Sequence, residues 1–184
     1  MDPDPILAAL YSEPGDTGPG TGASGKTGSV TLVNRLWPGD AKAVEAVGDG
    51  YDLFVARNLL KRGYIAPLAE TPDWAKVDLG VPNEDFPACL AAVLEPGGLA
   101  MIYNLGGTPG GPGSINPDLD YNAAADIAQP WSRAAWEAAG FTIVAFDEDD
   151  TEAAVAQMTA LGQIPEGTDP EGKFFARYTL LRRD

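Results

Sequence analysis

Apolar and polar residues alternate along the chain in blocks that predict a series of strands and helices. The predicted strands cover residues 29–37, 51–57, 99–105, 141–148 and 174–183, and the predicted helices cover 39–47, 83–94, 131–140 and 150–162. The runs YDLFVAR (51–57) and LAMIYNL (99–105) are almost continuously apolar, which is typical of strands buried on both faces of a sheet. Because a helix separates each strand from the next, we predict an α/β fold with a doubly wound, mostly parallel sheet.

Several helix ends are marked by capping residues. Asn83 stands before two acidic residues and an apolar run, so it is a predicted N-cap. Ser132 is the predicted N-cap of the stretch 131–140, and Gly140 ends it. In open parallel sheets ligands bind beyond the carboxyl ends of the strands, so the residues that follow each strand are the first candidates for a site.

The length of 184 residues favours one domain with a substantial core. Glycine and proline crowd into residues 13–29 and 106–118, which indicates loops in both places. We therefore expect a flexible Gly/Pro-rich leader at 1–29 and an α/β domain at 30–184. The long loop 106–129 is in a position to cover a substrate.

The net charge of −15 narrows the choice of partners. Such an acidic surface repels phosphate backbones and anionic lipid, so we expect no nucleic-acid partner and no membrane, and a small-molecule substrate suits the chain better. The chain has no apolar run near the ~20 residues of a membrane span, and its first residues lack the basic segment of a signal peptide. The single cysteine, Cys89, allows no internal disulfide, and we predict that it is a small buried apolar residue in a cytoplasmic protein.

The chain contains no histidine. This excludes Ser-His-Asp and Cys-His nucleophilic sites, the usual zinc sites and the commonest general base, and we expect no metal. An enzyme built on this sequence has to use carboxylates, Lys, Tyr or backbone groups, or it has to catalyse a reaction that needs little proton transfer.

Two glycine motifs overlap near the N-terminus. GTGASGKT (20–27) has the spacing of a phosphate-binding P-loop, and DTGPGTG (16–22) has that of the glycine loop that begins a methyltransferase cofactor site. A P-loop needs a strand before it and a helix after it, whereas here a predicted strand follows and none precedes. We therefore reject the P-loop, and the stretch is either a flexible leader or an altered cofactor loop.

Four segments farther along, in order and with suitable spacing, resemble class I S-adenosylmethionine-dependent methyltransferases. GDAKAVEAVGDGYDLFVARN (39–58) resembles the "GDA" segment and the fourth strand of that family, and VLEPGGLAMIYN (93–104) resembles its "L-x-PGG" turn and fifth strand. WSRAAWEAAGFTIVAFDED (131–149) resembles the next helix and strand, and FFARYTLLRR (174–183) resembles the last strand. The resemblance covers roughly residues 30–183 and implies a Rossmann-like methyltransferase sheet.

The same resemblance implies S-adenosylmethionine as cofactor and assigns roles to individual residues. Asp40 and Ala41 would line the adenine pocket, with the Asp40 carboxylate accepting from the exocyclic amine, and Arg57 and Asn58 would face the methyl donor and the substrate as catalytic residues. The glycine loop would add Gly18, Gly20 and Gly22. From the residues alone, Asp40 is equally an N-cap of the 41–47 helix, and Asn58 is equally a turn residue. Methyl transfer from a sulfonium depends chiefly on positioning, so a chain without histidine is compatible with it.

One part of the family pattern is missing. The family begins with a strand, the glycine loop, a helix and a second strand, and the few residues between Gly22 and the strand predicted at 29–37 cannot contain the last two, so the sheet is expected to be N-terminally incomplete. Two functions follow: a methyltransferase acting on a small molecule, or a non-catalytic or truncated methyltransferase-like domain that serves as a binding module. An open sheet edge in place of the missing unit predicts either association into a homo-oligomer or instability.

Overall fold

The computed structural model describes residues 17–21, 24–67, 76–107, 123–164 and 173–184. The chain forms two compact units, of which the first contains Met1–Gly48 and Leu79–Pro82 and the second contains Asp49–Asp78 and Asn83–Asp184. No helix of the described residues is long and apolar enough to cross a membrane.

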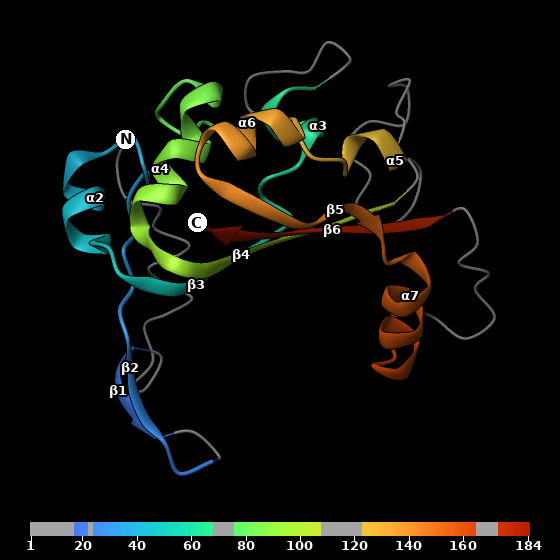
Figure 1. Cartoon of the computed structure of the whole chain (residues 1–184). Coiled ribbons are helices and arrows are strands. Elements are labelled where there is room, and N and C mark those ends of the chain that lie inside the picture. The colour runs from blue at the N-terminus through green and yellow to red at the C-terminus, as the bar shows by residue number, and fades with distance from the viewer. Residues whose placement is uncertain (1–16, 22–23, 68–75, 108–122, 165–172) are drawn as a thin grey trace. The chain divides into compact units, whose positions relative to one another are not determined.

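A four-stranded mixed sheet forms the second unit (Figure 1). Its strands are β3 (Tyr51–Arg57), β4 (Leu94–Gly107), β5 (Phe141–Asp149) and β6 (Phe174–Arg183), in the order β3-β4-β6-β5. β3 and β4 are parallel, while β6 is antiparallel to both of its neighbours. β3, β4 and β5 therefore run in one direction, and their carboxyl ends lie at the same edge of the sheet.

The prediction of a doubly wound, mostly parallel Rossmann-like sheet is wrong, because only the β3–β4 pairing in this sheet is parallel. The cause is the connection from β5 to β6. It leaves β5 after Asp149 and returns near Phe174 at the same edge, where Asp149 pairs with Arg177. Neighbouring strands joined at one edge are antiparallel, whereas a parallel neighbour requires a crossover from one edge to the other. The sequence pattern of strand, helix, strand does not distinguish the two connections.

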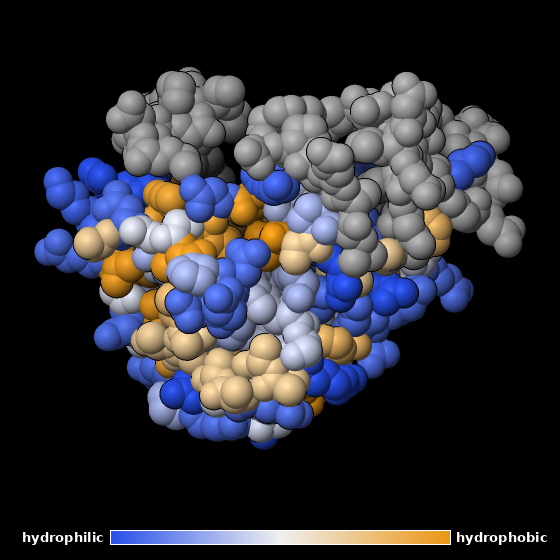
Figure 2. Space-filling view, turned by 90° about the horizontal axis from the view of Figure 1, so that it is seen from above, coloured by the Kyte–Doolittle hydropathy of each residue, from blue (hydrophilic) through white to orange (hydrophobic). Residues whose placement is uncertain are grey.

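The helices of the second unit are short and lie mainly on one face of the sheet (Figure 1). That face carries α3 (Arg62–Ile65), α4 (Phe86–Val93), α5 (Ala123–Asp126) and α6 (Arg133–Ala138), whereas α7 (Thr151–Ala160) lies on the other side. Seen from the side of α4 and α6, hydrophilic residues are interspersed with apolar ones (Figure 2). A 3-10 turn, η2 (Asn83–Asp85), precedes α4 and replaces the predicted Asn83 cap, since the Asn83 side chain donates instead to the Ile65 carbonyl, 2.9 Å away.

The core lies between this helical layer and the sheet. Four aromatic rings pack in sequence there, with centroid distances of 5.0 Å from Phe86 to Trp131, 5.3 Å from Trp131 to Trp136 and 5.6 Å from Trp136 to Phe141. Trp136 is completely buried between the helical layer and the sheet. Ser132 caps α6 as predicted, because its hydroxyl accepts from the Ala135 amide.

The opposite face of β3 and β4 is exposed, which corrects the prediction that both strands are buried on both faces. Leu53 is 55% exposed and Val55 is 58% exposed, and their register partners on β4, Leu99 and Met101, are each 36% exposed. The neighbouring positions on β4, such as Ile102, point into the core and are buried. The apolar run therefore reflects a strand with one covered face and one apolar, uncovered face.

The first unit contains a hairpin and a helix. β1 (Gly18–Thr21) pairs antiparallel with β2 (Thr27–Val30), so the first two residues and the last residue of GTGASGKT lie in paired strands, and the residues after it continue as a strand and not as the helix of a P-loop. The strand predicted at 29–37 is wrong beyond Val30, because β2 ends there and residues 31–37 form no strand. α2 (Ala41–Val47) follows, within the predicted helix.

A close backbone approach joins the two segments of this unit. A Cβ added at Gly39 would overlap the Gly80 Cα, and Gly80 has a φ of +70°. Only glycine fits at both places, which fixes residues 79–82 against the segment before α2.

Candidate functional site

The candidate site lies in the second unit, where β3, β4 and β5 end. The predicted catalytic residues Arg57 and Asn58 stand at the end of β3, Asn104 stands near the end of β4, and Asp147 stands near the end of β5. Asn58 and Asp147 are the non-glycine residues of the described chain with positive φ, at 58° and 56°. Such backbone conformations are uncommon for residues other than glycine and occur in turns, at irregularities and often at functional sites, and Asp147 lies at a register irregularity of β5.

Asn58 fastens the end of β3 to β4. Its backbone N–H donates to the Tyr103 carbonyl, 2.9 Å away, and its side-chain Oδ1 accepts from the Leu105 amide. Asn tolerates the left-handed conformation that this turn requires. The side-chain oxygen of this predicted catalytic residue is therefore already engaged in the fold.

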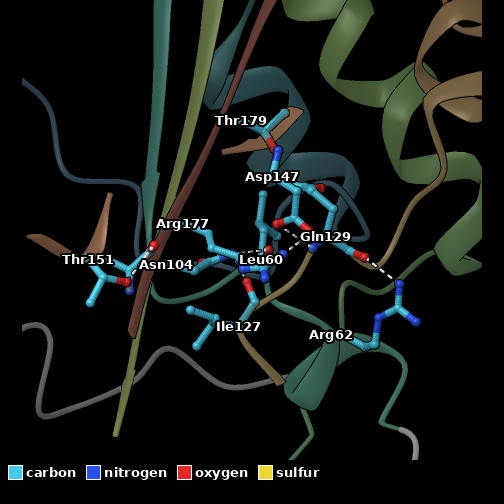
Figure 3. A network of polar contacts seen from close by, with 10 residues as sticks. Leu60, Arg62, Asn104, Ile127, Gln129, Asp147, Thr151, Arg177 and Thr179 are labelled. Carbon is cyan, nitrogen blue, oxygen red and sulfur yellow. Dashed lines mark hydrogen bonds and ion pairs between the residues drawn. The ribbon is translucent and has the colours of Figure 1, made fainter. Parts of the chain in front are cut away.

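Asn104 joins three distant parts of the chain (Figure 3). Its Nδ2 donates to the carbonyls of Leu60 and Ile127, each at 3.1 Å, and the residue is only 2% exposed. Its Oδ1 is buried and accepts no hydrogen bond from the described residues. Buried polar atoms are nearly always paired, so an acceptor left open at this edge of the sheet calls for an explanation.

Gln129 contributes a second open acceptor to the same network (Figure 3). Its backbone is held at both ends, because its N–H donates to Asp147 Oδ1 at 3.2 Å and its carbonyl accepts from Arg62 Nη2 at 2.9 Å. Gln129 is only 2% exposed, and its side-chain Oε1 accepts no hydrogen bond from the described residues. Arg62 Nε is a buried donor that likewise has no acceptor among the described residues.

Asp147 connects this network to β6. Its N–H donates to Thr179 Oγ1 at 3.0 Å, and its carboxylate lies 3.3 Å from Arg177 Nη1. Since the carboxylate also accepts from Gln129, its two oxygens are both used. Asp147 therefore holds the network in place.

Lys61 is a buried cation beside the site, only 6% exposed. Its Nζ lies 3.8 Å from Asp126 Oδ2 and 4.3 Å from the centroid of the Tyr64 ring. The carboxylate and the ring face together compensate the charge that burial would otherwise penalise. No three carboxylate or cysteine side chains converge as a metal site within the part of the chain that the structure describes.

Tyr103 stands at the end of β4, where its hydroxyl donates to Asp150 Oδ2 at 2.8 Å. Burial, together with the hydrogen bond and charge of Asp150, raises the pKa of Tyr103 to about 12, against the opposing effect of Arg57. The phenol is consequently protonated at neutral pH and cannot act there as a general base.

The predicted cofactor residues belong to the first unit. Asp40 caps α2, since Oδ1 accepts from the Lys42 amide at 2.8 Å and Oδ2 lies 3.2 Å from Arg35 Nη1. The Lys42 amide in particular lowers the pKa of Asp40 below its usual value. The N-cap interpretation is thus confirmed, with Ala41 as the first helical residue.

Two of the three glycines assigned to the cofactor lie in the hairpin of the first unit. Gly18, which has a φ of +87°, and Gly20 lie in β1, while Gly22 lies outside the described residues. A role for these glycines in cofactor binding stays a prediction.

Sequence reasoning pointed to the edge that contains Asn104 but missed Gln129. Asn104 ends a clear apolar run, and residues after strands are natural candidates. Gln129 follows a glycine- and proline-rich stretch and precedes Pro130, a context that carries no signal for burial. Only the folded chain brings it beside Asp147.

Comparison with protein families gives no match, and comparison with curated proteins gives none either. Among solved structures, the chain is similar to the [4+2]-cyclase SpnF, with a TM-score of 0.34 and 14% sequence identity over 73% of this chain. The match covers 50% of the SpnF chain, so the present chain spans about half of that protein. A likeness at this level is too distant to indicate a function.

Proposed function

We propose that the chain is an S-adenosylmethionine-dependent methyltransferase that acts on a small molecule. The observation that carries the proposal is the pair of buried amide oxygens, Asn104 Oδ1 and Gln129 Oε1, that accept no hydrogen bond from the described residues. They stand where β4 and β5 end, at the edge where α/β sheets bind ligands. The four segments that resemble the methyltransferase family supply the strands of this same sheet.

The open polar atoms suit a ligand with mixed chemistry. Two amide oxygens accept from N–H groups, and Arg62 Nε donates to a carboxylate, so together they match a ligand that carries both amino and carboxylate groups. S-adenosylmethionine carries these groups and, when bound, supplies a methyl group on a sulfonium. Arg57 and Asn58 are proposed to position the substrate, and the protonated Tyr103 leaves proton removal to other groups.

A titration calorimetry experiment with S-adenosylhomocysteine tests the proposal on the complete 184-residue chain. We expect saturable binding, and we expect Gln129→Leu to weaken it at least about five-fold, because a lost hydrogen bond to a buried partner is worth about 1–3 kcal/mol. Gln157→Leu makes the same chemical change at an exposed position of α7 and should leave the affinity unchanged. An absence of binding heat from a chain with a native circular dichroism spectrum would refute the proposal.

A second function, a non-catalytic methyltransferase-like binding module, is favoured by a different observation. The side-chain oxygens of Asp40 and Asn58, both predicted to serve the cofactor or the substrate, already accept hydrogen bonds from the amides of Lys42 and Leu105. If these residues serve only the fold, then Asp40→Asn, which keeps an acceptor for the Lys42 amide, should leave ligand affinity unaltered. A loss of affinity in that variant, with stability retained, would instead support the cofactor role of Asp40.

A further inference from the structure

β3 is an edge strand with an apolar face. In the described sheet it pairs with β4 alone, and the register is regular from Leu53 to Arg57 because the one irregularity falls between Tyr51 and Leu53. Proteins usually protect such an edge with proline, lysine or a bulge. The run Leu53–Arg57 contains none of these, and Leu53 and Val55 are more than half exposed.

The pairing with β4 fixes which backbone groups of β3 point outward. Asn58 N–H donates to Tyr103 on β4, so alternate residues before it, such as Ala56, also direct their backbone groups toward β4. Leu53, Val55 and Arg57 therefore direct their N–H and C=O groups away from the sheet. We call these outward groups the β3 edge.

We propose that the β3 edge binds a second copy of this chain, with the two β3 strands antiparallel about a two-fold axis at Phe54. In this register Leu53 lies opposite the partner's Val55, and each such pair exchanges both N–H···O=C bonds because both residues point outward. The two sheets would become one continuous sheet. The two neighbouring registers fit less well. If the partner strand is moved by two residues in one direction, Leu53 lies opposite the partner's Arg57. If it is moved in the other direction, Arg57 lies beyond the end of the partner's strand and has no residue opposite it.

The side chains of β3 complement themselves in this register. Leu53 and Val55 meet across the axis, so the uncovered apolar face that they share with Leu99 and Met101 continues into the second copy. Cross-strand aliphatic pairs of this kind stabilise a sheet. Arg57 lies opposite the partner's Tyr51, a pairing that suits a guanidinium and an aromatic ring.

The charges also favour an antiparallel pair. β3 contains one acidic residue, Asp52, and one basic residue, Arg57, so it is locally neutral in a chain with a net charge of −15. In the antiparallel register Asp52 lies opposite the partner's Ala56 and Arg57 lies opposite the partner's Tyr51, so no like charges face one another, whereas a parallel in-register pair would place Asp52 opposite Asp52. Because the rest of the surface is acidic, repulsion between the copies opposes association, and salt that screens this repulsion should strengthen the dimer.

Sedimentation velocity over a concentration series tests the proposal, with charge-swapped variants of the complete chain. One variant carries Leu53→Asp and Val55→Asp, and the other carries Leu53→Lys and Val55→Lys. In the proposed register each variant places like charges opposite one another, so we expect its homodimer to dissociate at least about ten-fold more readily than the wild-type dimer. An equimolar mixture should form a heterodimer, since position 53 of one variant then faces the opposite charge at position 55 of the other.

Val144→Lys is the matched control, because Val144 is 55% exposed on β5, at the other edge of the sheet. This variant should associate as the wild type does. The proposal is overturned if the wild type sediments as a monomer at all concentrations, or if both charge variants associate like the wild type. It is also overturned if two folded variants fail to combine, or if Val144→Lys abolishes association. Neither the β3 variants nor the control alter Gln129 or Arg62, so this outcome is separate from that of the ligand titration.

Discussion

The two buried amides at the site should respond in opposite ways to the same substitution. Asn104 and Gln129 are each 2% exposed and each carries an unpaired side-chain oxygen. They differ in one respect, because the Asn104 amide nitrogen donates to the carbonyls of Leu60 and Ile127, whereas the hydrogen bonds of Gln129 among the described residues use its backbone and not its side chain. Replacement of each by leucine removes the polar group and retains most of the volume.

The expected magnitudes follow from the hydrogen bonds. Asn104→Leu leaves two buried carbonyls without a donor, at about 1–3 kcal/mol each, and it relieves one unpaired oxygen, worth about 1–3 kcal/mol. The midpoints give a net loss of about 2 kcal/mol of unfolding free energy for Asn104→Leu. Gln129→Leu only relieves an unpaired oxygen, so by the same values it should raise the unfolding free energy by about 1–3 kcal/mol.

Urea unfolding followed by circular dichroism measures both effects. With a denaturant slope of about 2 kcal/mol/M, Asn104→Leu should lower the midpoint by about 1 M, whereas the Gln129→Leu midpoint should not fall. The slopes should match that of the wild type, which would show that the folded and unfolded states are unaltered in compactness. Equal losses in the two variants would refute the reasoning, because they would mean that volume alone, and not hydrogen bonding, determines the result.

Three further predictions concern packing, capping and pH. Trp136→Ala, which opens the centre of the aromatic cluster, should cost about 3–5 kcal/mol by the same urea assay, and a loss below 1 kcal/mol would contradict the packing described. Ser132→Ala should lower the melting temperature by about 2–4 °C through the loss of about 1 kcal/mol at the α6 cap, while Ser132→Asp should restore most of it. The raised pKa of Tyr103 stabilises the fold fully below its ordinary value near 10, and this contribution is lost as pH rises through about 12. Tyr103→Phe should therefore lack this part of the alkaline destabilisation, and parallel urea curves for both proteins between pH 9 and 12 would reveal it.

Local patterns in the sequence predicted most of the elements of the second unit. The bounds of β3 and β6 agree with the predicted 51–57 and 174–183, and the Ser132 cap and the Gly140 stop are both present. These features depend on neighbours in the chain, such as a hydroxyl that reaches an amide three residues ahead. The direction of a strand does not depend on such neighbours, because it depends on the edge of the sheet at which the preceding connection rejoins the sheet. The sequence therefore did not reveal that β6 is antiparallel to its neighbours.

The site was only partly predictable for the same reason. Arg57 and Asn58 could be placed at the carboxyl edge because they end an apolar run, and Asn104 lies close to the end of the predicted strand 99–105. The hydrogen-bond partners of these residues could not be predicted, because Asn104 donates to residues that are 44 and 23 positions away along the chain. Burial of Gln129 depends on the Asp147 and Arg62 contacts, which the folded chain alone creates.

The close approach of Gly39 and Gly80 has a practical consequence for dissecting this protein. Because residues 79–82 belong to the first unit while the segments on either side of them belong to the second, the backbone passes between the units more than once. No single cut separates them: a fragment beginning at Asp49 would retain Leu79–Pro82 but lose the glycine against which they pack. Expression of the second unit by itself would therefore require a redesigned connection in place of this short segment, and a library of simple truncations should yield poorly soluble pieces.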